Sequence, residues 1–186
     1  MNKLFKIVKD SSASLRQRCQ EVNPIDQDTI DLVNEMAEYL KLSQDEKYRE
    51  KHQLREGVGL AAPQIGKNIR ALVVYYEELQ EDGTTNVVDH RLINPKIISE
   101  SVKKVYLSGG EGCLSVDACH EGYVYRSFKI LVKAYEVSQG KEIVITARGY
   151  EAIVLQHELD HLNGVLFYDH IDKKDPFKII PDAVRL

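Results

Sequence analysis

The sequence has few cysteines, no long apolar run and no excess of basic residues. Its three cysteines are Cys19, Cys113 and Cys119. A sparse, odd-numbered set of thiols argues against a disulfide framework and indicates a reducing compartment, the cytoplasm. No stretch approaches the about 20 apolar residues that a membrane helix needs, and the charged N-terminus is not a secretory signal. We therefore expect a cytoplasmic protein with no membrane partner.

Composition and charge narrow the class of protein further. The chain has 186 residues, of which 43% are hydrophobic and 29% charged, as in an ordinary globular protein. This length suits one compact domain with a hydrophobic core, which we predict over residues 1–186. The formal net charge is −4. Nucleic-acid-binding surfaces usually show a basic excess, so no direct nucleic-acid binding is expected.

An amphipathic helix is predicted near the N-terminus. The segment from Asp26 is the predicted helix, and Asp26 or Asp28 can cap its start. Its apolar residues recur every three or four positions, at Ile30, Val33, Met36, Ala37 and Leu40. Residues 41–56 are dense in charge of both signs. This indicates a solvated helical extension or a loop.

Strand-like runs fill the middle of the chain. β-branched and aromatic residues predict strands at 71–76, 92–93, 96–99 and 102–107, and a hairpin formed by 128–137 and 142–147. A buried helix follows from 152 and ends at Asn163-Gly164. Residues 165–167 look like an exit strand. The pattern predicts an α+β fold, with mixed or antiparallel strands packed around a late buried helix and an N-terminal helix.

The late helix carries the pattern His-Glu-x-x-His at residues 157–161. His157 and His161 lie one turn apart, about 6 Å along the helix axis, so two imidazoles can face one metal ion. Glu158 lies about 100° around the helix. Its carboxylate is then beside the metal, where it can carry protons instead of coordinating. The alternative is two histidines that share a helix by accident.

A metal site needs a third protein ligand, and the sequence offers candidates on both sides of the helix. Phe167 stands ten residues after His157, where metzincin proteases carry a third histidine. Asp169, His170 and Asp172 are the downstream candidates. Upstream, Cys113 lies in the glycine-rich segment 109–115. A thiolate with two imidazoles leaves a fourth position open for water, which is typical of a catalytic site.

The neighbouring Cys119 and His120 allow a closed, structural metal site instead. Cys119 follows Cys113 by six positions, however, outside the spacing of about two to four residues usual in zinc knuckles. The remaining thiol, Cys19, is interpreted as a small buried hydrophobe.

Residues 57–66 contain no charge, and two of their glycines alternate with apolar residues. Two interpretations stay open for this segment. It is either a tight apolar turn in the core or a backbone that a ligand approaches closely.

Three segments together resemble the three signature motifs of the peptide deformylases. They are Gly-Val-Gly-Leu-Ala-Ala-Pro-Gln at 57–64, Glu-Gly-Cys-Leu-Ser at 111–115, and Gln-His-Glu-Leu-Asp-His-Leu at 156–162. Their order and separation match, and the resemblance extends over most of the chain. The charged insertion before Gly57 and the Ser-Val-Asp after Leu114 resemble the Gram-positive-type subgroup. Residues 118–121 depart from its pattern.

The resemblance implies a hydrolase that removes the formyl group from the N-terminal formylmethionine of nascent polypeptides and releases formate. It implies metal ligation by Cys113, His157 and His161, and proton transfer by Glu158. It further implies that the Gln64 side chain and the Leu114 N–H stabilise the developing oxyanion. The segment around Val58 and Gly59 would bind the substrate backbone.

The family also implies a cofactor and partners. One divalent metal ion is expected, iron(II) as the native metal, with zinc, nickel or cobalt as alternatives; thiolate and imidazole ligands suit several of these ions. The partners are N-formylmethionyl peptides, with a transient association with the ribosome where they are made. A monomer is expected.

Two other functions stay open on the residues alone. One is a metallopeptidase with Asp169 or His170 as third ligand. The other is a non-catalytic module stapled by a metal, in which Cys119 and His120 contribute.

Overall fold

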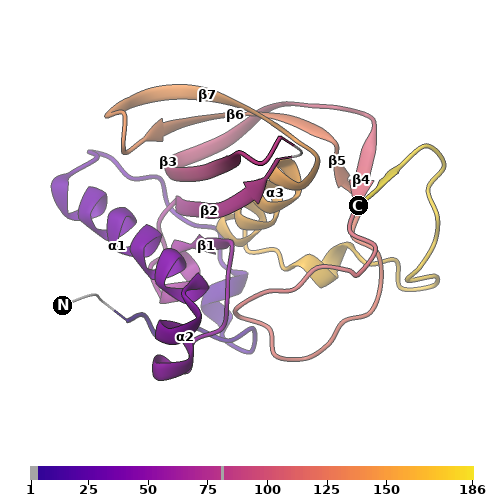
Figure 1. The fold of residues 1–186 in the computed structure, drawn as a ribbon, viewed down its shortest axis with the longest axis horizontal. Coiled ribbons are helices and arrows are strands. Elements are labelled where there is room, and N and C mark those ends of the chain that lie inside the picture. Colours follow the sequence, from indigo (N-terminus) through magenta and orange to yellow (C-terminus); the bar gives the residue numbers. More distant parts are fainter. Residues whose placement is uncertain (1–3, 81) are drawn as a thin grey trace.

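A five-stranded sheet is the central element of the computed structural model, which describes residues 4–80 and 82–186. The strands succeed one another in the order β1-β2-β3-β6-β7, and all four pairings are antiparallel (Figure 1). They are β1 (Gly59–Ala61), β2 (Ala71–Leu79), β3 (Thr85–Glu100), β6 (Lys129–Glu136) and β7 (Lys141–Arg148). A smaller sheet has the order β5-β4-β8, from β4 (Lys104–Tyr106), β5 (Arg126–Ser127) and β8 (Val184–Arg185).

Two long helices pack against opposite faces of the five-stranded sheet. Helix α3 (Gly149–Leu162) shares one core with alternate strand residues such as Leu72 and Val74. Helix α1 (Gln27–Gln44) shares a second core with Ala71 and Val73. Successive strand residues point to opposite faces, so β2 is buried on both sides where its sequence is unbroken in apolar residues. The expected α+β fold, with its late buried helix and N-terminal helix, is confirmed.

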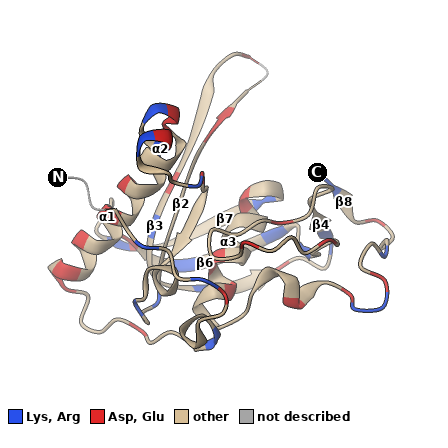
Figure 2. Cartoon of the chain, turned by 90° about the horizontal axis from the view of Figure 1, so that it is seen from below, with Lys and Arg blue, Asp and Glu red and all other residues tan. Residues whose placement is uncertain are grey.

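The charged segment 41–56 is largely helical. Helix α1 begins after Asp26, whose side chain accepts a hydrogen bond from the Thr29 N–H at 2.9 Å, and it continues to Gln44. A short helix α2 (Glu46–His52) follows, on which acidic and basic residues are mixed (Figure 2). These charges face solvent, and they contribute little to the core.

Two expectations about the strands are wrong. Residues 92–93 and 96–99 belong to one strand, β3, which passes through Pro95 with a register shift between Ile93 and Lys96. A proline is tolerated at such a bulge because it lacks the N–H that regular pairing uses. The predicted exit strand at 165–167 is absent, and Phe167 begins a 3-10 helix, Phe167–His170. Two further 3-10 helices are Ala13–Arg16 and Ala62–Ile65.

Within the described residues, no helix combines the length and the apolar character that crossing a membrane requires.

Gly164 ends α3 where the chain passes close to the N-terminal segment. Its φ is +76°, and a Cβ there would lie 2.6 Å from the Arg16 carbonyl oxygen. Gly83 has a similar φ of +81° in the β2–β3 turn, and none of the described residues lies within 4 Å of a Cβ built there. We predict that Gly83→Ala lowers the unfolding free energy by about 1 kcal/mol, the cost of a left-handed residue. Gly164→Ala should lower it further, because backbone must move. Urea denaturation measures both, and equal losses would contradict the close approach.

Candidate active site

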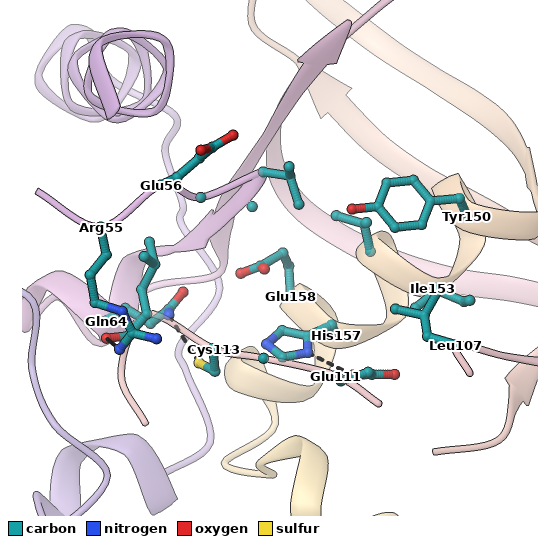
Figure 3. Close-up of a pocket in the computed structure, with 16 residues that line it drawn as sticks. Arg55, Glu56, Gln64, Leu107, Glu111, Cys113, Tyr150, Ile153, His157 and Glu158 are labelled. Atoms are coloured by element: carbon teal, nitrogen blue, oxygen red, sulfur yellow. Dashed lines mark hydrogen bonds and ion pairs between the residues drawn. The ribbon is translucent and has the colours of Figure 1, made fainter. Parts of the chain in front are cut away.

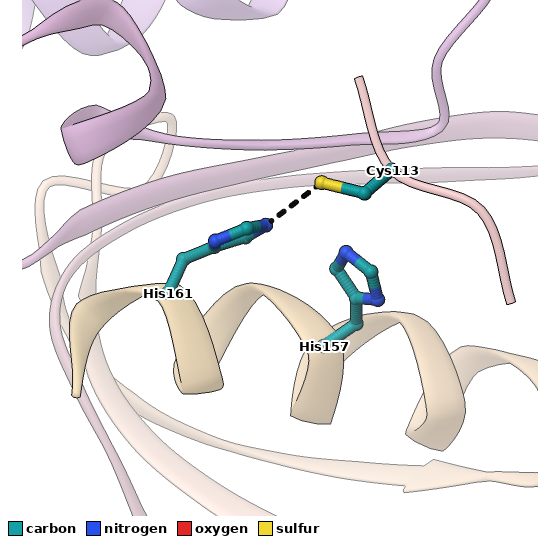
Figure 4. Close-up of side chains that lie close together, drawn as sticks. All are labelled: Cys113, His157 and His161. Atoms are coloured by element: carbon teal, nitrogen blue, oxygen red, sulfur yellow. Dashed lines mark hydrogen bonds between the residues drawn. The ribbon is translucent and has the colours of Figure 1, made fainter. Parts of the chain in front are cut away.

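Helix α3 and the loop before β5 bring three metal-ligating side chains together. The ligand atoms of Cys113, His157 and His161 all lie within 4.8 Å of one another. The Cys113 Sγ is 3.2 Å from the His161 Nε2, and the two imidazoles project from successive turns of α3 toward the thiol (Figure 4). All three side chains are buried. The structure therefore assembles the three residues that the sequence predicted as ligands.

The donor set fits a divalent transition metal. The His157 Nδ1 lies 2.8 Å from a Glu111 carboxylate oxygen, which leaves Nε2 for a metal. Such a carboxylate partner orients a metal-binding imidazole. One thiolate and two imidazoles suit zinc or iron(II), and they occupy three positions of a four-coordinate ion.

A buried ion-pair network supports the ligands. Arg126 donates two hydrogen bonds to Glu111, at 2.7 and 2.9 Å, and one to Asp160 at 2.6 Å. Burial by itself would raise the pKa of Glu111, but the hydrogen bonds from Arg126 and His157 lower this pKa to about 2. Glu111 is therefore an anion at neutral pH, and it accepts the His157 N–H.

Glu158 lies beside the ligands with its carboxylate in the pocket (Figure 3). Its side chain is buried, and its Oε2 has no hydrogen-bond partner among the described residues. Burial raises the pKa of Glu158 to about 7. A Cβ on Gly59 would lie 2.3 Å from the Glu158 Oε1. Only glycine at position 59 leaves room for this carboxylate, so the uncharged segment does let another group approach closely.

Gln64 and Leu114 line the same pocket as the Cys113 thiol. The Gln64 Oε1 accepts a hydrogen bond from the Ala61 N–H at 2.8 Å, which holds the side-chain amide in place. Its Nε2 points to the Ser115 Oγ at 3.2 Å and the Cys113 Sγ at 3.5 Å. For the Leu114 N–H, the described part of the chain provides no acceptor. The Gln64 amide thus directs an N–H toward the thiol, and the N–H of Leu114, the residue after Cys113, is left without a protein acceptor among the described residues.

A pocket of about 260 Å³ connects these groups. One wall is apolar and consists of Val58, Leu107, Tyr150, Ile153 and Val154. Sequence reasoning predicted Val58 but missed the other four. The apolar residues of α3 looked like ordinary core, since spacing alone does not tell a pocket wall from a packed face.

The other candidate ligands lie elsewhere. Asp169 pairs with Arg16, and the His170 Nε2 lies 2.7 Å from the Asp160 Oδ2. Cys119 is exposed. The His120 ring stacks on the Tyr168 ring with 4.1 Å between centroids. Among the described residues, none of these four joins the group formed by Cys113, His157 and His161.

Comparisons with known proteins agree on one family. The family model for polypeptide deformylase matches residues 4–177. A peptide deformylase of Macrococcus caseolyticus is 50% identical over 182 residues, covering 97% of this chain and 96% of the relative. The crystal structure of peptide deformylase from Ehrlichia chaffeensis has a TM-score of 0.75 and 34% identity, covering 94% of this chain and 91% of that one. A Met-Ala-Ser-bound class I type b peptide deformylase from Acinetobacter baumannii has a TM-score of 0.72 and 26% identity, covering 92% and 100%.

The Glu111 contact leads to a prediction about metal affinity. Glu111→Gln removes the anion that orients His157, so affinity for zinc should fall by about tenfold to a hundredfold. Competition with a chromophoric chelator measures this affinity. Glu121→Gln, an exposed carboxylate in the same loop, serves as the matched control and should bind zinc like the unaltered protein. Equal affinity of the Glu111 variant and its control would refute the orienting role.

Proposed function

The chain belongs to the polypeptide deformylase family, and we propose which of its residues carry the reaction. As a member of that family, it is a hydrolase that removes the formyl group from the N-terminus of nascent polypeptides, leaving formate and a free amino terminus. In our proposal Cys113, His157 and His161 hold one divalent metal ion. The observation that carries it is a buried Cys-His-His group beside Glu158, whose Oε2 has no hydrogen-bond partner among the described residues.

The bound ion supplies Lewis-acid chemistry: it polarises a carbonyl oxygen and lowers the pKa of water. We propose iron(II) as the native ion, with zinc, nickel or cobalt as substitutes. The thiolate and imidazole donors support this range of metals, and the family resemblance favours iron within it.

Glu158 is the proposed proton carrier. With a pKa near 7 from burial, its carboxylate can accept and release a proton close to neutral pH. It takes a proton from the attacking water and passes it to the nitrogen of the departing amine. Burial also keeps bulk water from competing for this proton. Gly59 keeps the carboxylate in place because no side chain there can displace it.

Gln64 and Leu114 are the proposed oxyanion donors. As water attacks the formyl carbon, negative charge develops on the formyl oxygen, and the Gln64 Nε2 and Leu114 N–H donate hydrogen bonds to it. One such donor typically contributes about 3 kcal/mol of transition-state stabilisation. The Ala61 N–H orients the Gln64 amide before substrate arrives.

Strand β1 is the proposed docking edge for the substrate backbone. The Tyr75 N–H donates to the Val58 carbonyl at 2.9 Å, so Val58 faces β2. In an antiparallel pair the next residue points its N–H and C=O the other way, which turns Gly59 to the free edge. An extended peptide can pair with Gly59 and place its methionine side chain against Val58, Tyr150 and Ile153. The Met-Ala-Ser complex of the Acinetobacter baumannii relative supports this class of ligand.

The substrate also suggests the setting in which the enzyme works. Formylated chains are made on ribosomes in the cytoplasm, so we place the enzyme there, in transient contact with the ribosome. We further propose a monomer in which residues 1–186 form one catalytic domain. Segments from both ends of the sequence meet around the site, as in the contact of Arg16 with Asp169, which supports a single domain.

Two substitutions test the roles at the metal centre. Cys113→Ser should lose the metal and with it deformylation of formyl-Met-Ala. Glu158→Ala should keep its metal but lower kcat by about a hundredfold or more, because the proton carrier is gone. Metal content and formate release are measured on each variant. Full deformylase activity of Glu158→Ala would show that the mechanism is wrong. A Cys113→Ser protein that retains its metal and cleaves internal peptide bonds would favour a metallopeptidase.

Metal reconstitution tests the proposed ion. Apoenzyme prepared anaerobically and loaded with iron(II) should be more active than the zinc form and should lose activity in air, because iron held by a thiolate is open to oxidation. Enzyme loaded with nickel is the third form in the comparison, and its activity should be less sensitive to air than that of the iron(II) form. Equal, air-stable rates with all three metals would contradict the iron assignment.

A further inference from the structure

The turn that contains Leu114 is fixed by hydrogen bonds that its carbonyl groups accept. The Val116 N–H donates to the Cys113 carbonyl at 3.2 Å, which closes a turn over residues 113–116. The Asp10 N–H donates to the Ser115 carbonyl at 2.9 Å. Side chains outside the turn bind the Leu114 and Val116 carbonyls. All four carbonyls of the turn therefore have donors, and three of them are held from distant parts of the sequence.

Two cations supply the side-chain contacts. The Arg55 Nη1 lies 3.3 Å from the Leu114 carbonyl oxygen and 3.1 Å from that of Val116, and the Lys9 Nζ lies 3.4 Å from the Leu114 oxygen. Both cations also bind the Asp117 Oδ1, Lys9 at 2.6 Å and Arg55 at 3.0 Å. Asp117 thus joins a side chain from the N-terminal segment to one from the loop before β1.

The N-terminal segment also reaches the second oxyanion donor. The Val8 N–H donates to the Gln64 carbonyl at 2.8 Å, two residues before Asp10 binds Ser115. Residues 8–10 therefore span the gap between Gln64 and the turn that presents Leu114. These two donors must keep a fixed separation to bind one oxygen atom. Residues 8–10 connect the backbone of Gln64 to the turn of Leu114, and they do so through hydrogen bonds that involve none of Cys113, His157 and His161.

We propose that Lys9 and Arg55, joined through Asp117, are positioning residues that aim the Leu114 N–H at the reacting oxygen. This inference rests on the proposed role of Leu114. The Leu114 N–H shares one planar peptide group with the Cys113 carbonyl, which accepts from the Val116 N–H. The Leu114 carbonyl lies in the next peptide group, so holding both carbonyls fixes the two torsions of Leu114 and the direction of its N–H. Arg55 also lines the pocket, whereas Lys9 does not, so Lys9 acts on catalysis through the turn and not by touching substrate.

The exposure of this cluster separates positioning from stability. The Lys9 and Asp117 side chains are 44% and 65% exposed, and exposed ion pairs contribute little to the stability of a fold. Hydrogen-bond donors for a developing oxyanion, by contrast, lose effect when displaced by a fraction of an ångström. A positioning role therefore predicts a loss in kcat without a loss of folding.

Steady-state kinetics of Lys9→Met on formyl-Met-Ala test the proposal. We expect kcat to fall by about tenfold with KM within about twofold, because the missing interaction belongs to the transition state. Metal content and the unfolding midpoint should not change. Lys9→Arg should restore most of kcat, since it can reach the same acceptors. Lys6→Met is the matched control, an exposed lysine three residues earlier, and should behave like the unaltered enzyme.

A double-mutant comparison tests whether Lys9 acts through its contact with Asp117. Asp117→Asn should lower kcat as Lys9→Met does, and the pair should lower it by less than the product of the two single effects, since both disrupt one contact. An unchanged kcat in Lys9→Met, or a fall that Lys6→Met shares, overturns the inference. So does a fall that tracks metal loss or unfolding. Glu158→Ala assayed alongside keeps the outcomes apart: if it is inactive while Lys9→Met is normal, only the positioning role fails.

Discussion

The buried contact of Arg126 with Glu111 and Asp160 holds the site together. Glu111 lies two residues before the thiol ligand, and Asp160 lies next to the second histidine. One guanidinium on β5 therefore ties the cysteine loop to the helix that carries both imidazoles. Removing a partner from a buried network leaves an uncompensated charge, so each member requires the others. The network therefore stabilises the arrangement in which Cys113, His157 and His161 converge.

The five-stranded sheet and α3 fix the positions of these side chains and leave the pocket beside them open. The sheet packs against α3 on one face, so the helix turns that carry His157 and His161 are rigid. Its edge strand β1 passes close enough to Glu158 that position 59 has no room for a side chain. Among the described residues, the other edge of this strand pairs with no neighbouring strand, and Gly59 on it lines the pocket. Rigidity of the ligands and access for an extended peptide thus come from a single arrangement of sheet and helix.

Local signals predicted much of the fold. The spacing of apolar residues predicted α1, with Asp26 or Asp28 as its cap, and the structure uses Asp26. Runs of β-branched residues predicted the hairpin of β6 and β7. Predictions failed where tertiary context overrides a local rule. Pro95 looked like a strand break, yet a bulge accommodates it within β3. Residues 165–167 looked like a strand, but Phe167 packs against Val116 and Val124 in a small core of its own. Neither outcome is encoded in nearby residues.

Three motifs in the sequence predicted the family. The family in turn implied the chemistry and the six residues expected to perform it at the metal and beside it. Helical periodicity is local, so even the joint position of His157, Glu158 and His161 was determined in advance. Only the tertiary structure decided what surrounds them. Arg126 reaches Glu111 and Asp160, and Lys9 reaches Asp117, across separations of 15 to 108 residues. Contacts at such distances depend on how the whole chain packs, and no spacing rule in the sequence predicts them.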